Sequence, residues 1–236
     1  MFPVSDSPRS RTTPFVNIGL IVACVAVFIY EITLSQADIN RFFIDYGAVP
    51  RDLTRWVNHP SGADEPVTVI TSAFIHGGWL HLVGNMLYLW VFGDNVEDAL
   101  GHVRYLLFYL VAAAGAVTLQ VAMDINEVIP MVGASGAIAG VLGAYLVLYP
   151  RAHVGVIIPP FLWAIPVPAL ALIVFWFVLQ LATGFATIGT ATGGSEGVAV
   201  WAHVGGFVTG FAIVLLLRPF IGRRSPSPRS GRESLW

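Results

Sequence analysis

Charge and cysteine are scarce in this sequence, and lysine is missing altogether. Charged side chains make up 11% of the 236 residues, apolar residues make up 56%, and the mean hydropathy is +0.75. A water-soluble domain of this length would lack the polar surface to cover itself, so the composition indicates an integral membrane protein. Its 12 basic residues are all arginines of tails and loops, and with a net charge of −2 they imply no nucleic-acid partner. The single cysteine, Cys24, excludes a disulfide within the chain.

Long apolar runs are abundant. A hydrocarbon core of ~30 Å needs roughly 20 helical residues, and six runs approach or reach that length. They are Asn17 to Leu34, Leu80 to Val96, Tyr105 to Val121, Ala134 to Tyr149, Ala164 to Thr183 and Val198 to Leu217. The sequence therefore predicts an all-α, polytopic bundle of six transmembrane helices over residues 17–217.

Arginines outside the predicted spans indicate the orientation. Arg9 and Arg11 precede the first span, and five arginines follow the last one. By the positive-inside rule, an even number of spans then places residues 1–16 and 218–236 in the cytoplasm as tails of a multi-pass protein of the cell membrane. Residues 222–236, rich in serine, proline and arginine, are predicted to be disordered. The alternative of a signal peptide cleaved after "SQA", residues 35–37, is disfavoured because its apolar run exceeds the usual 7 to 15 residues.

Few polar side chains lie inside the spans, where each is costly and usually faces a cavity, a partner or a site. The ones that stand out are Glu31, His81, Asn85, Ser135 and His203. Taken alone, Ser135 is best explained as part of a stripe of small residues that lets helices approach closely.

The predicted depth of these polar residues in the membrane changes that interpretation. Ser135 lies sixteen residues before Arg151, and His203 fifteen before Arg218. At 1.5 Å per residue both side chains lie ~23 Å above the inner boundary, and His81 comes out near ~20 Å. Three polar groups thus share one level below the outer surface, and the fourth helix starts inside the membrane. Irregular backbone tolerates that depth only where protein buries it or water reaches it.

The first turn of a short helix beside a water-filled cavity suits nucleophilic chemistry at Ser135. Unpaired N–H groups and the positive end of the helix dipole stabilise developing negative charge there. His203 lies at matching depth to take the hydroxyl proton. Gly206 and Gly210 share its helix face, so this thin face would pack on the glycines of the fourth helix. A purely structural histidine is the alternative.

The stretch "HLVGN", residues 81–85, puts two side-chain donors on one helical face. A carbonyl that becomes tetrahedral needs donors aimed at its oxygen, and His81, Asn85 and the Ser135 backbone N–H would supply three. Taken alone, the His81 and Asn85 pair fits helix packing equally well.

Together these residues carry a resemblance to a known family. "GASG" at 133–136, "HLVGN" at 81–85 and "AHVGG" at 202–206 look like the three signature motifs of the rhomboid intramembrane serine proteases. "GAVP" at 47–50 and "GDNVEDALG" at 93–101 resemble segments of bacterial members. The resemblance runs from about Asn17 to Leu217 and keeps the order and spacing of the motifs.

The resemblance implies a serine endopeptidase that cuts transmembrane protein substrates within the lipid bilayer, near its outer face, through an acyl-enzyme. It implies that Ser135 is the nucleophile, His203 the general base, and His81 with Asn85 the oxyanion donors, with no cofactor and no metal. Many members carry a tyrosine four residues after the serine that stacks on the histidine, whereas this chain has Ala139. We expect Trp201 or another aromatic residue to replace it.

Two segments of the sequence bear on how a substrate reaches the site. The stretch from Thr183 to Val200, rich in glycine, threonine and serine, is interpreted as a mobile cap over the cavity or as a plain connecting loop. The fifth span, with Pro166 and Pro168 at its start, is either a lateral gate, as proposed in the family, or an ordinary lipid-facing helix. Glu31 is expected to reach the membrane interface.

Three other functions compete with this interpretation. A transporter would use the polar residues as a pathway, but the chain shows no inverted repeat. An inactive rhomboid-like binding protein would lack the serine or the histidine. A zinc protease would need a ligand set such as HExxH, which the sequence does not contain.

Overall fold

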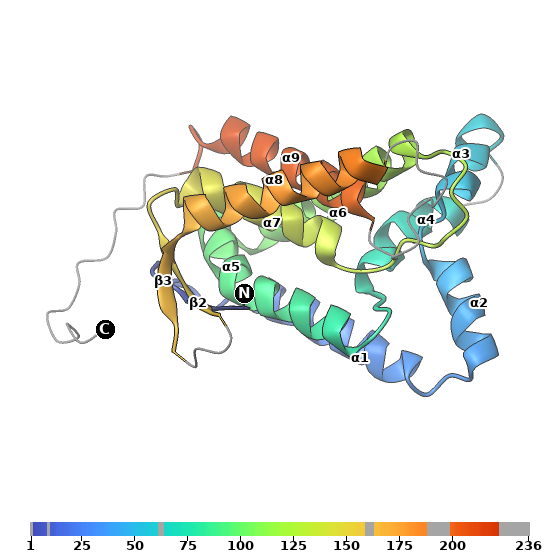
Figure 1. The fold of residues 1–236 in the computed structure, drawn as a ribbon, viewed down its shortest axis with the longest axis horizontal. Helices are drawn as coiled ribbons and strands as arrows, with labels where there is room; N and C mark the ends of the chain where they lie inside the picture. The colour runs from blue at the N-terminus through green and yellow to red at the C-terminus, as the bar shows by residue number, and fades with distance from the viewer. Residues whose placement is uncertain (1, 9, 61–63, 159–162, 188–198, 222–236) are drawn as a thin grey trace, which may run out of the picture.

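Helices dominate the fold (Figure 1). The computed structural model describes residues 2–8, 10–60, 64–158, 163–187 and 199–221. In chain order the elements are β1 (Phe2–Asp6), α1 (Phe15–Glu31), α2 (Gln36–Tyr46), α3 (Pro50–Asn58), α4 (Asp64–Thr71), η1 (Ser72–Phe74), α5 (Trp79–Leu100), α6 (His102–Met123), α7 (Ser135–Leu148), β2 (His153–Ile157), β3 (Ile165–Pro168), α8 (Ala169–Thr187) and α9 (Val200–Leu217).

Several helices are long and apolar enough to cross a membrane. Among the described residues these are α6, most of α8, and α9, while α4 with η1 and α5 form a fourth candidate that is bent by 81°. Helices α1 and α7 are apolar but have only 17 and 14 residues. The predicted all-α polytopic fold is confirmed, whereas the number of six spans stays a prediction.

The fifth predicted span begins later than expected. Ala164 does not start a helix, because residues 165–168 form β3 and α8 begins only at Ala169. Pro166 and Pro168 explain the difference, since proline lacks the N–H that a helix interior or a central strand requires. An edge strand tolerates both, and β3 lies at the edge of the sheet with Pro166 opposite Gly155.

A small antiparallel sheet of order β1-β2-β3 was not expected from the sequence. Its first strand comes from residues 1–16, which are predicted to be a tail. The Ser7 N–H donates to the His153 carbonyl at 2.8 Å, and the Asp6 carboxylate accepts from the Tyr145 hydroxyl at 2.6 Å and from Asn95 Nδ2 at 2.9 Å. The start of the chain is therefore part of the fold, at the left end in Figure 1.

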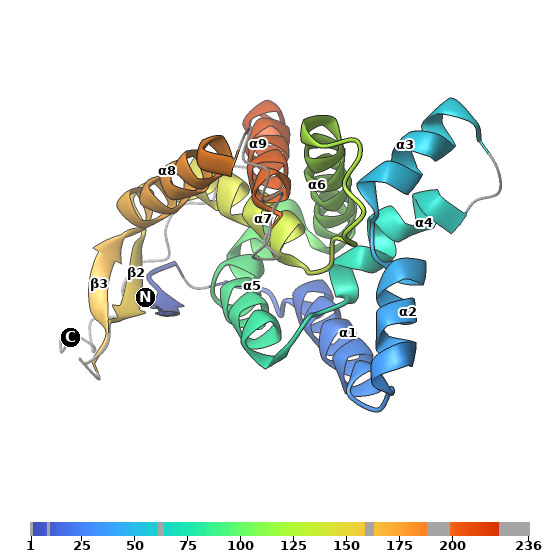
Figure 2. The same ribbon diagram turned by 45° about the vertical axis from the view of Figure 1, so that its right-hand side comes forward.

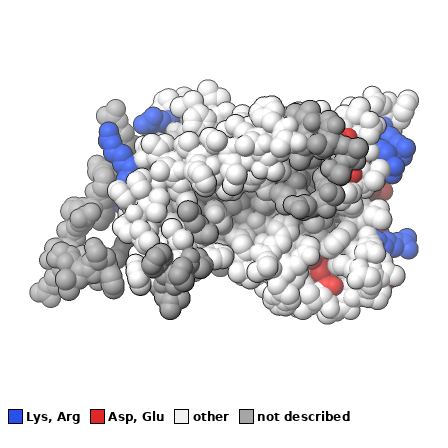
Figure 3. Space-filling view, viewed as in Figure 1, with Lys and Arg blue, Asp and Glu red and all other residues white. Residues whose placement is uncertain are grey.

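The two ends of the molecule differ from the belt between them. The sheet lies at one end, and α2, α3 and α4 lie at the other (Figure 1). On the face shown in Figure 3, the basic side chains gather at these two ends and leave a largely uncharged belt between them. Such a belt is the surface that a hydrocarbon core requires.

Helix α7 lies at the centre of the bundle (Figure 2). It contacts α5, α6 and α9, and most of its residues are buried. Its contact with α9 is backbone on backbone. A Cβ added to Gly206 would lie 1.8 Å from the Gly136 carbonyl oxygen, and one added to Gly210 would lie 2.2 Å from the Gly140 carbonyl oxygen. The predicted packing of glycine faces between these two helices is confirmed.

Buried Glu97 ties the C-terminal end of α5 to the first residues of α1. Glu97 is fully buried, and its carboxylate accepts the backbone N–H groups of Val16 and Asn17 and contacts His102. Arg104, seven residues further along the chain, forms no ion pair with Glu97 among the described residues.

Candidate active site

Ser135 is the first residue of α7, as the sequence predicts. The chain leading to it is held by the segment between α2 and η1, because Met131 pairs with Ala48 and the Gly133 N–H donates to the Ser72 carbonyl at 2.8 Å. Gly133 has φ +125°, a region that favours glycine. Ser135 therefore sits at a helix N-terminus whose first N–H groups have no acceptor within the helix.

The imidazole of His203 lies within hydrogen-bond distance of the Ser135 hydroxyl. His203 Nε2 and Ser135 Oγ are 2.8 Å apart, although the residues are 68 positions apart in the sequence. The glycine contacts between α7 and α9 make this approach possible, because Gly136 follows the serine directly and Gly206 follows the histidine by three residues. The arrangement matches the nucleophile and base geometry of activated serines.

His81 and Asn85 lie next to the turn that precedes Ser135. A Cβ added to Gly133 would lie 2.6 Å from His81 Nε2 and 3.6 Å from Asn85 Nδ2, so both side chains border this glycine. Asn85 is 8% exposed, and its Nδ2 has no hydrogen-bond partner among the described residues. A buried amide donor without a partner costs free energy, which a mere packing role does not explain.

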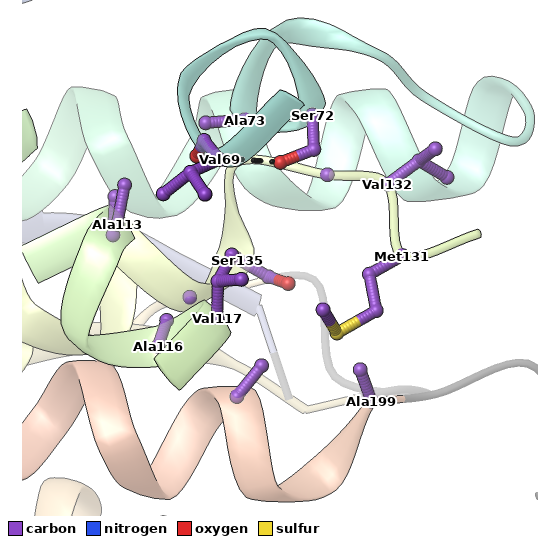
Figure 4. Close-up of a pocket in the computed structure, with 14 residues that line it drawn as sticks. Val69, Ser72, Ala73, Ala113, Ala116, Val117, Met131, Val132, Ser135 and Ala199 are labelled. Atoms are coloured by element: carbon purple, nitrogen blue, oxygen red, sulfur yellow. Dashed lines mark hydrogen bonds between the residues drawn. The ribbon is translucent and has the colours of Figure 1, made fainter. Parts of the chain in front are cut away.

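A cavity of about 40 Å³ lies beside the serine (Figure 4). Its wall combines Ser135 with small or flexible apolar side chains, among them Ala116, Val117, Met131 and Ala199. The volume suits one or two water molecules or a small side chain. The site thus has room for a reacting group next to the hydroxyl.

Two residues of α8 that were not predicted as site residues contact His203. The Gln180 side-chain nitrogen lies 2.8 Å from His203 Nδ1, and the Trp176 ring lies 5.9 Å from the imidazole, centroid to centroid. Trp201, the suggested replacement for the family tyrosine, instead packs edge-on against Phe185. A signal for Gln180 was present, because it is the only amide side chain of the fifth predicted span.

The N-terminus of α9 has a partner that sequence analysis also missed. The Ala202 N–H donates to the side-chain oxygen of Gln120 on α6, at 3.1 Å. This bond satisfies one of the first N–H groups of α9, beside His203. Gln120 therefore fixes the helix that holds the histidine without touching the imidazole by any described hydrogen bond.

Glu31 is buried inside the protein, although the sequence suggests that it reaches the membrane interface. It is 4% exposed, and its carboxylate accepts the backbone N–H of His76 at 3.2 Å. The His76 ring in turn lies edge-on to His81, with centroids 5.2 Å apart. The turn before α5 offers an unpaired N–H, which explains why the carboxylate turns inward. Glu31 thus supports the backbone that leads to His81.

The structure describes only part of the predicted cap between Thr183 and Val200. Helix α8 continues to Thr187, so the first residues of the stretch are helical, contrary to the expectation of a loop from Thr183 onward. Residues 188–198, on which the prediction of a cap mainly falls, lie outside the described residues.

Comparisons with known proteins agree with the motifs. A family described as the Rhomboid domain matches residues 63–220. RHOMBOID-like protein 5 of Arabidopsis thaliana is 32% identical over 160 residues, which cover 67% of this chain and 47% of the relative. RHOMBOID-like protein 4 of the same plant is 31% identical over 73% of this chain and 41% of the relative, and Rhomboid protease GluP of Bacillus subtilis is 34% identical over 61% and 24%. The matches cover less than half the length of these relatives. Since the family match covers more than half of the chain, this protein belongs to the rhomboid family.

Proposed function

We propose that this protein is an intramembrane serine endopeptidase with Ser135 as its nucleophile and His203 as its general base. The observation that carries the proposal is the distance of 2.8 Å between Ser135 Oγ and His203 Nε2. The hydroxyl stands at a helix N-terminus, beside a cavity and near an unpartnered buried amide. The name Rhomboid protease of the Bacillus relative supports the same reaction class.

In the first half of the reaction, Ser135 Oγ attacks the substrate carbonyl while its proton passes to His203 Nε2. The carbonyl oxygen becomes negative and is met by the Ser135 backbone N–H, by Asn85 Nδ2 and by a donor nitrogen of His81. His203 then gives the proton to the amide nitrogen that leaves, and an ester on Ser135 remains.

In the second half, water attacks the ester carbonyl and His203 takes a proton from that water. The tetrahedral intermediate collapses, His203 returns the proton to Ser135 Oγ, and the free acid leaves. No carboxylate hydrogen-bonds to His203 in the described part of the chain, so its two ring nitrogens contact Ser135 and Gln180 instead.

The substrates are proposed to be transmembrane proteins that are cut near the outer membrane face. A substrate helix in lipid has all its amides paired, so its peptide bond cannot be attacked until it unwinds. Segments with glycine, proline or other weak helix formers would unwind at the lowest cost. Equal cleavage of substrates that differ only in helix stability would contradict this part of the proposal.

Cleavage of a single-span substrate by the purified protein in bilayers tests the function, alongside folded Ser135→Ala and His203→Ala variants. We expect only the wild type to cut and a fluorophosphonate to label wild-type Ser135. Labelling without cleavage would mean that the chosen substrate is wrong. Absence of both would favour an inactive rhomboid-like binding protein.

A further inference from the structure

Both ring nitrogens of His203 are engaged, and the second partner is a glutamine. Nε2 lies 2.8 Å from Ser135 Oγ, and Nδ1 lies 2.8 Å from the side-chain nitrogen of Gln180. In proteases with a triad, the position facing Nδ1 belongs to a carboxylate that selects the tautomer and orients the ring. Here an uncharged amide occupies that position.

The chemistry of a general base decides which end of the amide must face the ring. To accept the hydroxyl proton, Nε2 needs a free lone pair, so Nδ1 of the neutral ring must carry the hydrogen. The partner of Nδ1 then has to be an acceptor, which is the amide oxygen and not the amide nitrogen. The two ends of a glutamine amide are nearly equal in size, and a half-turn about its last bond exchanges them.

We propose that Gln180 is the positioning residue of His203, with its amide oxygen accepting the Nδ1–H of the imidazole in the working site. This inference rests on the proposed function. In the structure the amide nitrogen faces Nδ1, which places the hydrogen on Nε2. In this tautomer Nε2 cannot accept the hydroxyl proton of Ser135. Rotation of the same side chain gives the ready tautomer without any movement of the backbone.

The surroundings of Gln180 explain why an amide suits this position. Much of its helix is exposed: Val178 and Leu179, the two residues before Gln180, are 55% and 54% exposed. In a membrane an ionised carboxylate at this place would carry a large desolvation cost, whereas an amide accepts the same hydrogen bond without a charge.

A second contact from the same helix restricts the ring from another side. Trp176 precedes Gln180 by four residues, so both side chains project from one face of α8. Its ring is tilted by 42° against the imidazole at 5.9 Å. Together the two residues confine His203 in a chain that has Ala139 where many relatives have a stacking tyrosine.

The decisive experiment compares the pH dependence of kcat/KM for Gln180→Met, Gln180→Glu and the wild type. We expect Gln180→Met to lower kcat by roughly 10- to 100-fold with little change in KM, because the tautomer is no longer selected. In Gln180→Glu the carboxylate favours the protonated imidazole, so the acid limb of the profile should move to higher pH, with activity retained above it. Full activity of Gln180→Met would overturn the proposal.

Gln120→Met is the matched control, because Gln120 supports the backbone of α9 through Ala202 rather than the imidazole. It should lower thermal stability and leave the acid limb unchanged. A shift of the limb in this variant equal to that in Gln180→Glu would mean that the shift reports helix packing, which contradicts the proposal.

Nitrogen NMR of the histidines gives a second measurement that needs no cleavage. In Ser135→Ala, the His203 resonance, identified by its loss in His203→Ala, should report the Nδ1–H tautomer, and Gln180→Met should remove that preference. An Nε2–H tautomer would refute the role of Gln180. Lack of cleavage and of fluorophosphonate labelling in the wild type would instead refute the proposed function, so the two failures are distinguishable.

Discussion

The backbone of Gly206 on α9 lies against the carbonyl oxygen of Gly136 on α7, so closely that an added Cβ would be 1.8 Å from that oxygen. Gly136 directly follows Ser135, and Gly206 lies one helical turn beyond His203. The separation of hydroxyl and imidazole is therefore set by contact between two main chains. No rotamer change can relieve a clash with backbone atoms.

This contact predicts that Gly206→Ala separates the two helices. The overpacked interface should lower the free energy of unfolding by about 1–3 kcal/mol, and cleavage should fall by roughly 10-fold or more as the hydroxyl and imidazole move apart. Thermal unfolding and steady-state cleavage measure the two effects. Gly19→Ala is the control, because a Cβ there meets nothing within 4 Å. Equal behaviour of both variants would show that the helices are not in backbone contact.

Removal of the Asn85 amide should affect the chemical step. Because the oxygen of the tetrahedral intermediate would lose a donor, Asn85→Ala is expected to lower kcat by roughly 10²-fold or more with little change in KM. His81→Ala should act in the same direction. The measurement is steady-state cleavage in bilayers, with thermal unfolding as the check on folding. Unchanged kcat in folded Asn85→Ala would remove this residue from the proposed mechanism.

Loss of the Trp176 ring should lower kcat more than loss of the neighbouring Phe175 ring on the same helix. Trp176→Ala removes the ring beside the imidazole, and we expect kcat to fall by roughly 10-fold or more because His203 loses its fixed orientation. Phe175, which is 61% exposed, points away from the bundle. Phe175→Ala is the matched control and should retain near-normal kcat. Comparable losses in both variants would indicate a general weakening of α8.

Asp6 should make the docking of β1 depend on pH. Burial raises the pKa of its carboxyl from 3.8 to about 7, with nearby Asp94 contributing in the same direction and the Tyr145 hydrogen bond opposing it. The folded state thus binds the proton more tightly than the unfolded state. Stability from this group is fully present below about pH 4 and is lost as pH rises through about 7.

Hydrogen exchange of residues 2–6 between pH 5 and pH 8 checks this expectation. Exchange should report weaker protection of β1 at pH 8 than at pH 5, after correction for the intrinsic pH dependence of exchange. Asp6→Asn should flatten the difference, because an amide does not ionise. Protection that is independent of pH in the wild type would contradict the raised pKa.

Much of the site could be predicted from sequence because its geometry follows from helical spacing. The number of residues between each side chain and the next arginine predicts one depth for Ser135 and His203, and Gly206 and Gly210 indicate the thin face of α9. The structure brings the serine and histidine together as expected. Their catalytic roles stay a prediction.

Other features of the site depend on contacts that residue spacing does not reveal. Gln180 and Trp176 reach His203 from another helix, so their relevance depends on how α8 packs on α9. Glu31 turned inward because the backbone N–H of His76 needed an acceptor. The sheet was missed because β1 is short and its partner strand lies far along the chain.

That last pairing has a consequence for assembly. Ser7 and His153 are joined although they are 146 positions apart, so β1 has no partner while the first seven helices are being synthesised. The β1–β2 pairing can form only after β2 has been synthesised, and β2 follows α7, the helix that begins with Ser135. Because β3 leads directly into α8, completion of the sheet also anchors the start of the helix that supplies Gln180. The sheet therefore forms late in synthesis and stabilises a bundle whose central helix, α7, has already been made.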